Sequence, residues 1–144
     1  MENPEIKARY RRFTERLVAI VIIGACFGCA SSSFRNPSAD IPRTKQVAII
    51  ANDVRFRPLL QSSLESHGFR VVPNDTQGAL MCLAKFEGFT FTRAEVSLWD
   101  GSKKLISGTA SNNGWGNWVA HDAAKQGVIS SAVQEFDNEL ASLR

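Results

Sequence analysis

The order of apolar and polar residues predicts that the folded part of the chain begins with a strand, a helix and a second strand. Residues 46–51 (QVAIIA) are a short β-branched apolar run between polar neighbours, which is typical of a buried strand. Asn52 and Asp53 can cap a following helix, and Gly68 stands where a helix-ending glycine belongs. Residues 69–72 form the second strand. This β-α-β unit should pair its strands in parallel through a right-handed crossover.

The remaining pattern predicts three more strands and a long terminal helix. Residues 79–86 are apolar, and residues 89–99 alternate between apolar and polar positions, as a half-buried strand does. Residues 100–103 (DGSK) have the composition of a hairpin turn, after which residues 104–110 return as the partner strand. Residues 118–143, with a start near Asn117, carry apolar residues at helical spacing.

These elements in the order β-α-β-β-β-β-α predict an α+β fold. We expect a mixed four- to five-stranded sheet with both helices packed on one face. Glu135 and Glu139 lie four residues apart on the last helix, where a solvated face is the expected environment. His67 ends the first helix, and we expect it to cap or pack there.

The start of the chain has the pattern of an export signal. Residues 1–16 are rich in charge, and residues 17–28 (LVAIVIIGACFG) are apolar throughout. A run of about twelve residues is too short to span a bilayer, which needs about twenty, but it suits the apolar region of a signal peptide. An uncleaved anchor helix and an ordinary signal peptide are the alternatives.

Residues 23–26 (IGAC) resemble a lipobox, the cleavage motif of bacterial lipoproteins, which has an aliphatic residue and two small ones before a cysteine. The resemblance implies that Cys26 becomes a diacylglyceryl cysteine at the mature N-terminus and carries further acyl chains such as palmitate. Cys29 is the alternative, although Phe27 and Cys26 precede it where the motif prefers small and aliphatic residues. Two or three acyl chains would anchor the protein stably to a membrane.

The lipobox divides the chain into three parts: a signal peptide (1–25), a lipidated flexible tether (26–45) and a periplasmic α/β domain (46–144). The tether is expected to be flexible because it is rich in serine and proline. Phe27 follows the cysteine, and the aspartate that resembles an inner-membrane retention signal is absent there. We therefore expect the lipid anchor to lie in the outer membrane rather than the inner one.

The charge distribution argues against nucleic acid as a partner. The formal net charge is +3, but five of the 17 basic residues and three of the 14 acidic ones lie in residues 1–16. The remaining 12 basic and 11 acidic residues nearly balance, so the domain has no electrostatic footprint for a phosphate backbone.

Catalytic motifs are scarce, so the chain is not expected to be an enzyme. There is no G-x-S-x-G elbow and no phosphate-binding glycine loop, and neither a metal site nor a cofactor is indicated. His121 is followed by Asp122, but neighbouring residues on a helix do not face each other. Cys82 lies in an apolar strand and should behave as a small hydrophobe. A disulfide with Cys29 is possible in an oxidising compartment.

The glycine-rich segment 111–117 and the residue after it hold the candidate binding residues, Trp115, Asn117 and Trp118. Tryptophan is enriched at binding hot spots and at membrane interfaces. The leading hypothesis is a non-enzymatic envelope lipoprotein that acts as an interaction or assembly module for a protein partner. The alternative is a small-ligand or glycan-binding lipoprotein that uses Trp115 and Trp118.

The order of the predicted elements also resembles known envelope domains. Residues 98–105 (LWDGSKKL) form a hairpin of the kind found in the N-terminal domain of the Tol-system propeller protein and in the curli-secretion lipoprotein. There, an early strand–helix–strand is followed by such a hairpin and a terminal helix. The resemblance covers residues 46–142, concerns layout alone, and supplies no catalytic residue.

Overall fold

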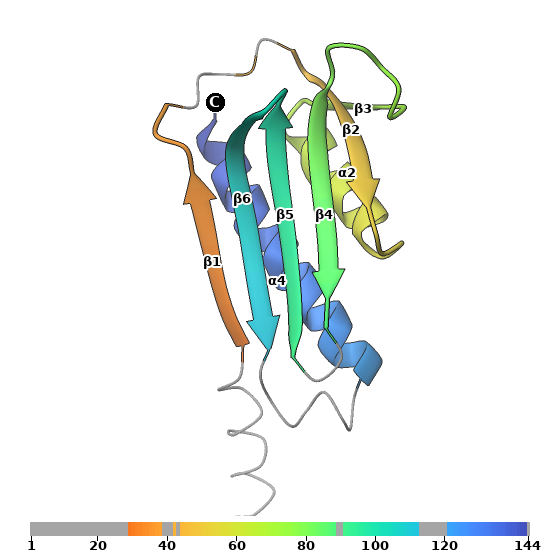
Figure 1. Ribbon diagram of the computed structural model, residues 1–144, viewed down its shortest axis with the longest axis vertical. Coiled ribbons are helices and arrows are strands. Elements are labelled where there is room, and N and C mark those ends of the chain that lie inside the picture. Colours follow the sequence, from red (N-terminus) through yellow and green to blue (C-terminus); the bar gives the residue numbers. More distant parts are fainter. Residues whose placement is uncertain (1–28, 39–41, 43, 89–90, 113–120, 144) are drawn as a thin grey trace, which may run out of the picture.

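The computed structural model describes residues 29–38, 42, 44–88, 91–112 and 121–143. They form one mixed sheet and two helices, which confirms the predicted α+β class (Figure 1). The strands are β1 (Cys29–Arg35), β2 (Gln46–Ala51), β3 (Arg70–Val72), β4 (Leu80–Glu87), β5 (Thr92–Asp100) and β6 (Lys103–Asn112). The helices are α2 (Phe56–Ser66) and α4 (His121–Ser142).

The sheet has six strands in the order β1-β6-β5-β4-β2-β3. Strand β2 is parallel to both β3 and β4, which confirms the predicted parallel pairing of the first strand–helix–strand unit. Strands β4, β5, β6 and β1 are antiparallel to one another in turn. The expected number of four to five strands was therefore too low, because β1 was not predicted.

Strand β1 is a correction to the predicted tether, because residues 29–35 pair with β6 along their full length. Its sequence, CASSSFR, has weak strand propensity, so the reason for the strand is tertiary. Ser31 Oγ donates to Glu135 Oε1 at 2.8 Å and Ser33 Oγ donates to Glu139 Oε1 at 2.6 Å. The sequence predicted a solvated face for these two glutamates. The bonds show that both instead accept hydrogen bonds from β1.

Both helices pack on one face of the sheet, as predicted (Figure 1). The core between the layers is aliphatic and aromatic, and its largest fully buried side chains include Phe56, Leu60, Leu98 and Phe136. Helix α4 approaches β6 so closely at Gly108 that a Cβ there would lie 2.3 Å from the backbone nitrogen of Phe136. A glycine is required at this position because a side chain would separate the layers.

The start of α2 differs from the expected cap. The helix begins at Phe56, and Arg55 is the N-cap residue. The Arg55 side chain makes no capping hydrogen bond to the helix backbone. Asp53 Oδ1 instead accepts the Arg55 backbone N–H at 3.0 Å in the preceding turn. Asn52 bonds the backbone of Phe86 in both directions, at 2.9 and 2.8 Å, and so extends the pairing of β2 with β4.

Neither described helix is both long and apolar enough to cross a membrane.

Candidate functional site

The face of the sheet opposite the helices, here called the open face, is the candidate site. Alternation along the strands directs apolar residues such as Ala94, Val96 and Leu98 toward the helices, and Arg93 and Glu95 toward the other side. The same alternation on the neighbouring strands places the following side chains on the open face: Ala30, Ser32, Phe34, Ala48, Ile50, Met81, Leu83, Lys85, Glu87, Ser97, Trp99, Lys104, Ser107, Thr109 and Ser111.

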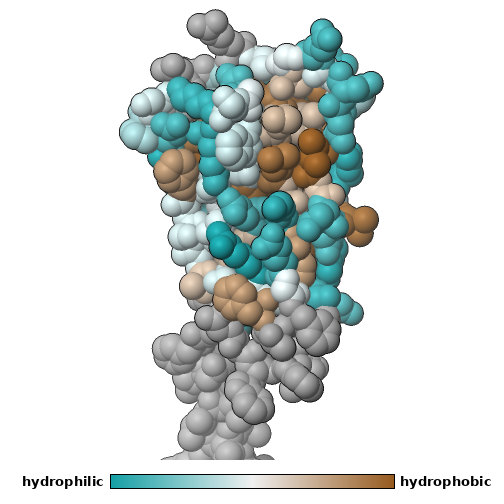
Figure 2. Space-filling model, viewed as in Figure 1, coloured by the Kyte–Doolittle hydropathy of each residue, from teal (hydrophilic) through white to brown (hydrophobic). Residues whose placement is uncertain are grey.

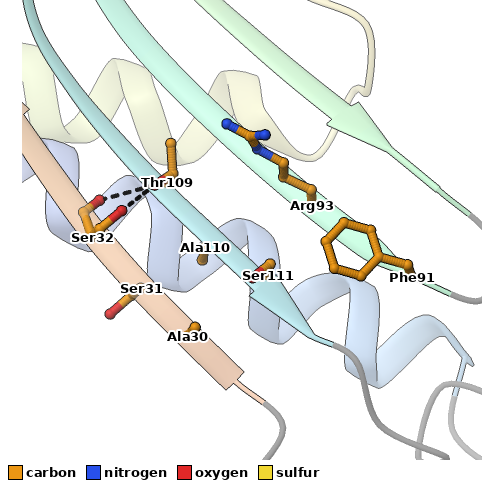
Figure 3. Close-up of a pocket in the computed structure, with 8 residues that line it drawn as sticks. All are labelled: Ala30, Ser31, Ser32, Phe91, Arg93, Thr109, Ala110 and Ser111. Atoms are coloured by element: carbon orange, nitrogen blue, oxygen red, sulfur yellow. Dashed lines mark hydrogen bonds between the residues drawn. The ribbon is translucent and has the colours of Figure 1, made fainter.

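Two adjoining hollows on β1, β6 and β5 form a polar groove in this face. One has a volume of about 280 Å³ and the other about 340 Å³, and both are lined by Ser32, Arg93 and Thr109. The hydroxyls of Ser32 and Thr109 lie 2.6 Å apart, and the Thr109 hydroxyl also donates to the Ser32 carbonyl at 3.2 Å (Figure 3). Phe91 borders the first hollow and Phe34 the second.

A small charge network occupies the middle of the groove. One carboxylate oxygen of Glu95 accepts a hydrogen bond from Lys104 Nζ at 2.8 Å. A guanidinium nitrogen of Arg93 lies 3.5 Å from the other oxygen. The Lys104 ammonium also lies 5.8 Å from the ring centroid of Phe34 and 5.9 Å from that of Trp99. Two cations share one carboxylate here, so the network keeps one positive charge, and the groove suits a polar partner that carries some negative charge.

Next to the groove the open face is apolar. Met81 lies opposite both Ala48 and Trp99, while Ile50 lies opposite Leu83. Figure 2 shows brown surface on the upper part of this face, above a hydrophilic area in teal. We call these five residues the apolar patch. Ile50 and Met81 are the exposed members of this patch, and Ala48 is buried beneath them. Exposed apolar surface bordered by polar residues is typical of interaction sites.

A second polar cluster joins the two helices. Asp137 Oδ1 accepts the Ser63 hydroxyl at 2.5 Å and lies 3.0 Å from His67 Nε2. Although serine, histidine and aspartate meet here, both partners bind the same carboxylate oxygen. This arrangement does not place the imidazole as a base between the other two, as nucleophilic catalysis requires. His67 is the C-cap of α2, as predicted, and the cluster holds the helices together.

The Cys82 thiol is buried in the core and is free of any disulfide. Burial raises its pKa to about 12, so the thiol stays protonated and unreactive at neutral pH. The expectation that Cys82 behaves as a small hydrophobe is confirmed. The disulfide with Cys29, which the sequence left possible, is not formed. Within the part of the chain that the structure describes, no cluster of three or more histidine, cysteine or acidic residues could hold a metal ion.

Most residues singled out from the sequence fall outside the described segments. Cys26, Trp115, Asn117 and Trp118 all do, so their predicted roles stay predictions. The side chain of His121 is likewise outside the description, although the residue begins α4. Cys29 begins β1, and only its backbone is described.

The open face was not predicted as a site from the sequence. The alternation of Arg93 and Glu95 with buried residues indicated that one face of β5 is polar, but it did not show which strands adjoin it. Phe34 and Ser32 belong to the groove only because β1 pairs with β6. The signal in the sequence for this strand was the segment CASSSFR, in which Ala30, Ser32 and Phe34 occupy alternate positions.

The sequence matches no known protein family, and no characterised protein is similar enough in sequence to be matched. Several solved structures match in fold, including two at low identity. One is a dodecamer of a PelC point variant from Paraburkholderia phytofirmans, with 13% identity, a TM-score of 0.45, and coverage of 75% of this chain and 98% of that one. The other is a minor lipoprotein from Acinetobacter baumannii, with 10% identity, a TM-score of 0.44, and coverage of 68% and 91%. At these TM-scores the likenesses carry no argument about function.

Proposed function

We propose that this protein is a lipid-anchored envelope module without enzymatic activity, which binds a protein partner through the open face. The anchor is the lipidated Cys26, with Cys29 as the alternative, and the domain faces the periplasm from the outer membrane. The lipobox-like residues support the anchor, and the open face supports the binding role.

The observation that carries the binding role is the placement of exposed apolar side chains. Five large hydrophobic residues of the described chain are exposed, and Phe34, Ile50, Met81 and Phe91 are four of them. All four lie on the open face, whereas the helices bury their apolar residues against the sheet. Ile50 and Met81 belong to the apolar patch, whereas Phe34 and Phe91 border the polar groove. Burying exposed apolar side chains together with neighbouring polar groups is the usual basis of a specific protein interface.

A second candidate function is glycan binding in the polar groove. Hydroxyls from Ser32, Thr109 and Ser111 line the same hollow as the exposed ring of Phe91. Sugars bind to such a combination of hydrogen-bonding groups and an aromatic face. The predicted ligand-binding role of Trp115 and Trp118 belongs to this hypothesis.

In-cell photo-cross-linking tests the protein-binding role. A benzoylphenylalanine probe replaces Met81 or Ile50 in the full-length lipidated chain, one position at a time. Both residues are exposed, so the probe should not disturb the core. We expect the same discrete protein adduct from both positions, because they lie on neighbouring strands of the apolar patch.

The matched control places the same probe on the exposed helix positions Ser62 and Gln134. Adducts from the helix positions alone, or no protein adduct from either sheet position, would contradict the proposal. If purified envelope glycans instead shift the tryptophan fluorescence while the protein adducts of both positions persist, both surfaces bind. A shift without any protein adduct would favour the glycan alternative.

A further inference from the structure

We infer that the end of the sheet at which β1 starts lies against the bilayer, and that Phe91 inserts its ring into the lipid interface. This inference rests on the proposed lipid anchor and names a second partner, a lipid surface, for part of the open face. It is carried by the short chain between the anchor and β1, and by the position of Phe91.

The distance from the anchor to the sheet is limited by the covalent chain. Strand β1 begins at Cys29, three residues after Cys26. Three extended residues span at most about 11 Å. If Cys29 carries the lipid instead, the separation vanishes. With either cysteine, the first residue of β1 must therefore lie close to the headgroups, which together with the interfacial region occupy about 7 Å on each side of the hydrocarbon core.

The register identifies what else lies at this end. Cys29 lies opposite Asn112, the last residue of β6, and Asn112 lies opposite Thr92, the first residue of β5. The three residues form a row across the sheet. Adjacent strands are about 4.8 Å apart, so the start of β5 is roughly 10 Å from the start of β1. Phe91, next to Thr92, is thus held at the same end as the anchor.

The side chain of Phe91 is suited to the lipid interface. Its exposed fraction is 48%, and it lines the same hollow as Ala30, the second residue of β1 (Figure 3). Aromatic side chains are enriched where a membrane meets water. Arg93, two residues further along β5, points to the same face, and its exposed side chain can contact anionic headgroups.

The opposite end of the sheet provides a matched control. Ser102, in the turn between β5 and β6, is exposed and lies beyond the far end of a strand of ten residues. At about 3.3 Å per residue, that strand places Ser102 roughly 30 Å from the row at the anchor end. A side chain at residue 102 should therefore not reach the lipid that residue 91 touches.

The test places benzoylphenylalanine at residue 91 or at residue 102 in the full-length protein, which is purified lipidated and reconstituted in nanodiscs containing anionic phospholipid. After irradiation, mass spectrometry measures phospholipid adducts and the acylation of the N-terminal peptide. We expect lipid adducts at residue 91 at least tenfold above those at residue 102. A Phe91→Trp variant should show quenching by brominated lipid greater than that of the parent protein.

The possible failures are distinguishable. Equal lipid adducts at the two positions on an acylated protein would overturn the membrane contact of Phe91 and leave the anchor standing. A protein adduct at residue 91 in cells, without a lipid adduct, would assign Phe91 to the protein-binding surface. An N-terminal peptide without acylation would overturn both the anchor and this inference, because the limit of about 11 Å would no longer apply.

Discussion

Ser33 on β1 and Glu139 on α4 are 106 residues apart in the chain and joined by a 2.6 Å hydrogen bond. Ser31 and Glu135 repeat this contact one helical turn away. The two bonds attach the first strand to the last helix. They explain how a serine-rich segment at the edge of the sheet becomes a strand.

Removing both carboxylates should loosen β1 without unfolding the domain. We expect the double variant Glu135→Ala, Glu139→Ala to lose about 1 kcal/mol of unfolding free energy, because both bonds are partly exposed to water. Amide hydrogen exchange in residues 30–34 should become faster while exchange in β4 and β5 stays unchanged. The neighbouring exposed variant Gln134→Ala is the control, and equal exchange in the two proteins would contradict the assigned role of the glutamates.

Gly108 and Gly127 form a matched pair of glycine positions. A Cβ at Gly108 would meet the backbone of α4 at 2.3 Å and 2.4 Å, whereas a Cβ at Gly127 meets nothing within 4 Å. Gly108→Ala should therefore destabilise the domain by about 2 kcal/mol through overpacking. Gly127→Ala should stabilise it by up to about 1 kcal/mol, because alanine is the better helix former. Denaturant unfolding of both variants tests the close contact, which a neutral Gly108→Ala would disprove.

The pair of Asp53 and Arg55 should make a small contribution to stability that depends on pH. The side-chain hydrogen bond from Arg55, at 2.8–2.9 Å, lowers the pKa of Asp53 below its ordinary value. A group whose pKa is lower in the folded state stabilises the fold above its unfolded pKa of about 3.9 and loses this effect as the pH falls through the folded value.

We therefore expect Asp53→Asn to cost about 0.5 kcal/mol at pH 7, within the range for ion pairs near the surface. The difference from the parent protein should shrink below pH 4. Urea unfolding between pH 2.5 and pH 7 measures it, with Asp75→Asn, which alters an exposed residue in a turn, as the control. A difference that grows toward low pH would have the wrong sign for this account.

The buried Cys82 thiol should resist alkylation while the protein is folded. Burial raises its pKa to about 12, and its exposed fraction is 0%. In a Cys26→Ser, Cys29→Ser variant, in which Cys82 is the one cysteine, maleimide should label the protein only after unfolding in guanidinium. Rapid labelling of the native protein would show that β4 opens readily or that the core is not packed as described.

The sequence predicted the fold best where the local pattern and the tertiary environment agree. The β-branched run of β2 lies in a buried strand, and the bounds predicted for it match the structure. The turn at Gly101, whose φ is +58°, also falls within the predicted hairpin. Strand β1 could not be predicted in this way, because serine has little preference for strands and its stabilising partners lie on α4.

The candidate site was predicted less well for the same reason. Alternation along β5 indicated that Arg93 and Glu95 share a face, but no local signal places Lys104 against Glu95 or Phe34 beside Lys104. Those contacts depend on the order β1-β6-β5, which is a property of the whole sheet. Trp115 and Trp118 were predicted as binding residues from composition alone, and they lie outside the described residues.

The mass of the mature N-terminal peptide tests the lipid anchor, on which both the proposed location and the membrane contact depend. The full-length chain is expressed in a bacterium with lipoprotein processing, with and without globomycin. We predict a peptide that begins at Cys26 and carries a diacylglyceryl group and a further acyl chain, with the uncleaved form accumulating under globomycin. An unmodified, uncleaved peptide that begins at Met1 in untreated cells would contradict the account.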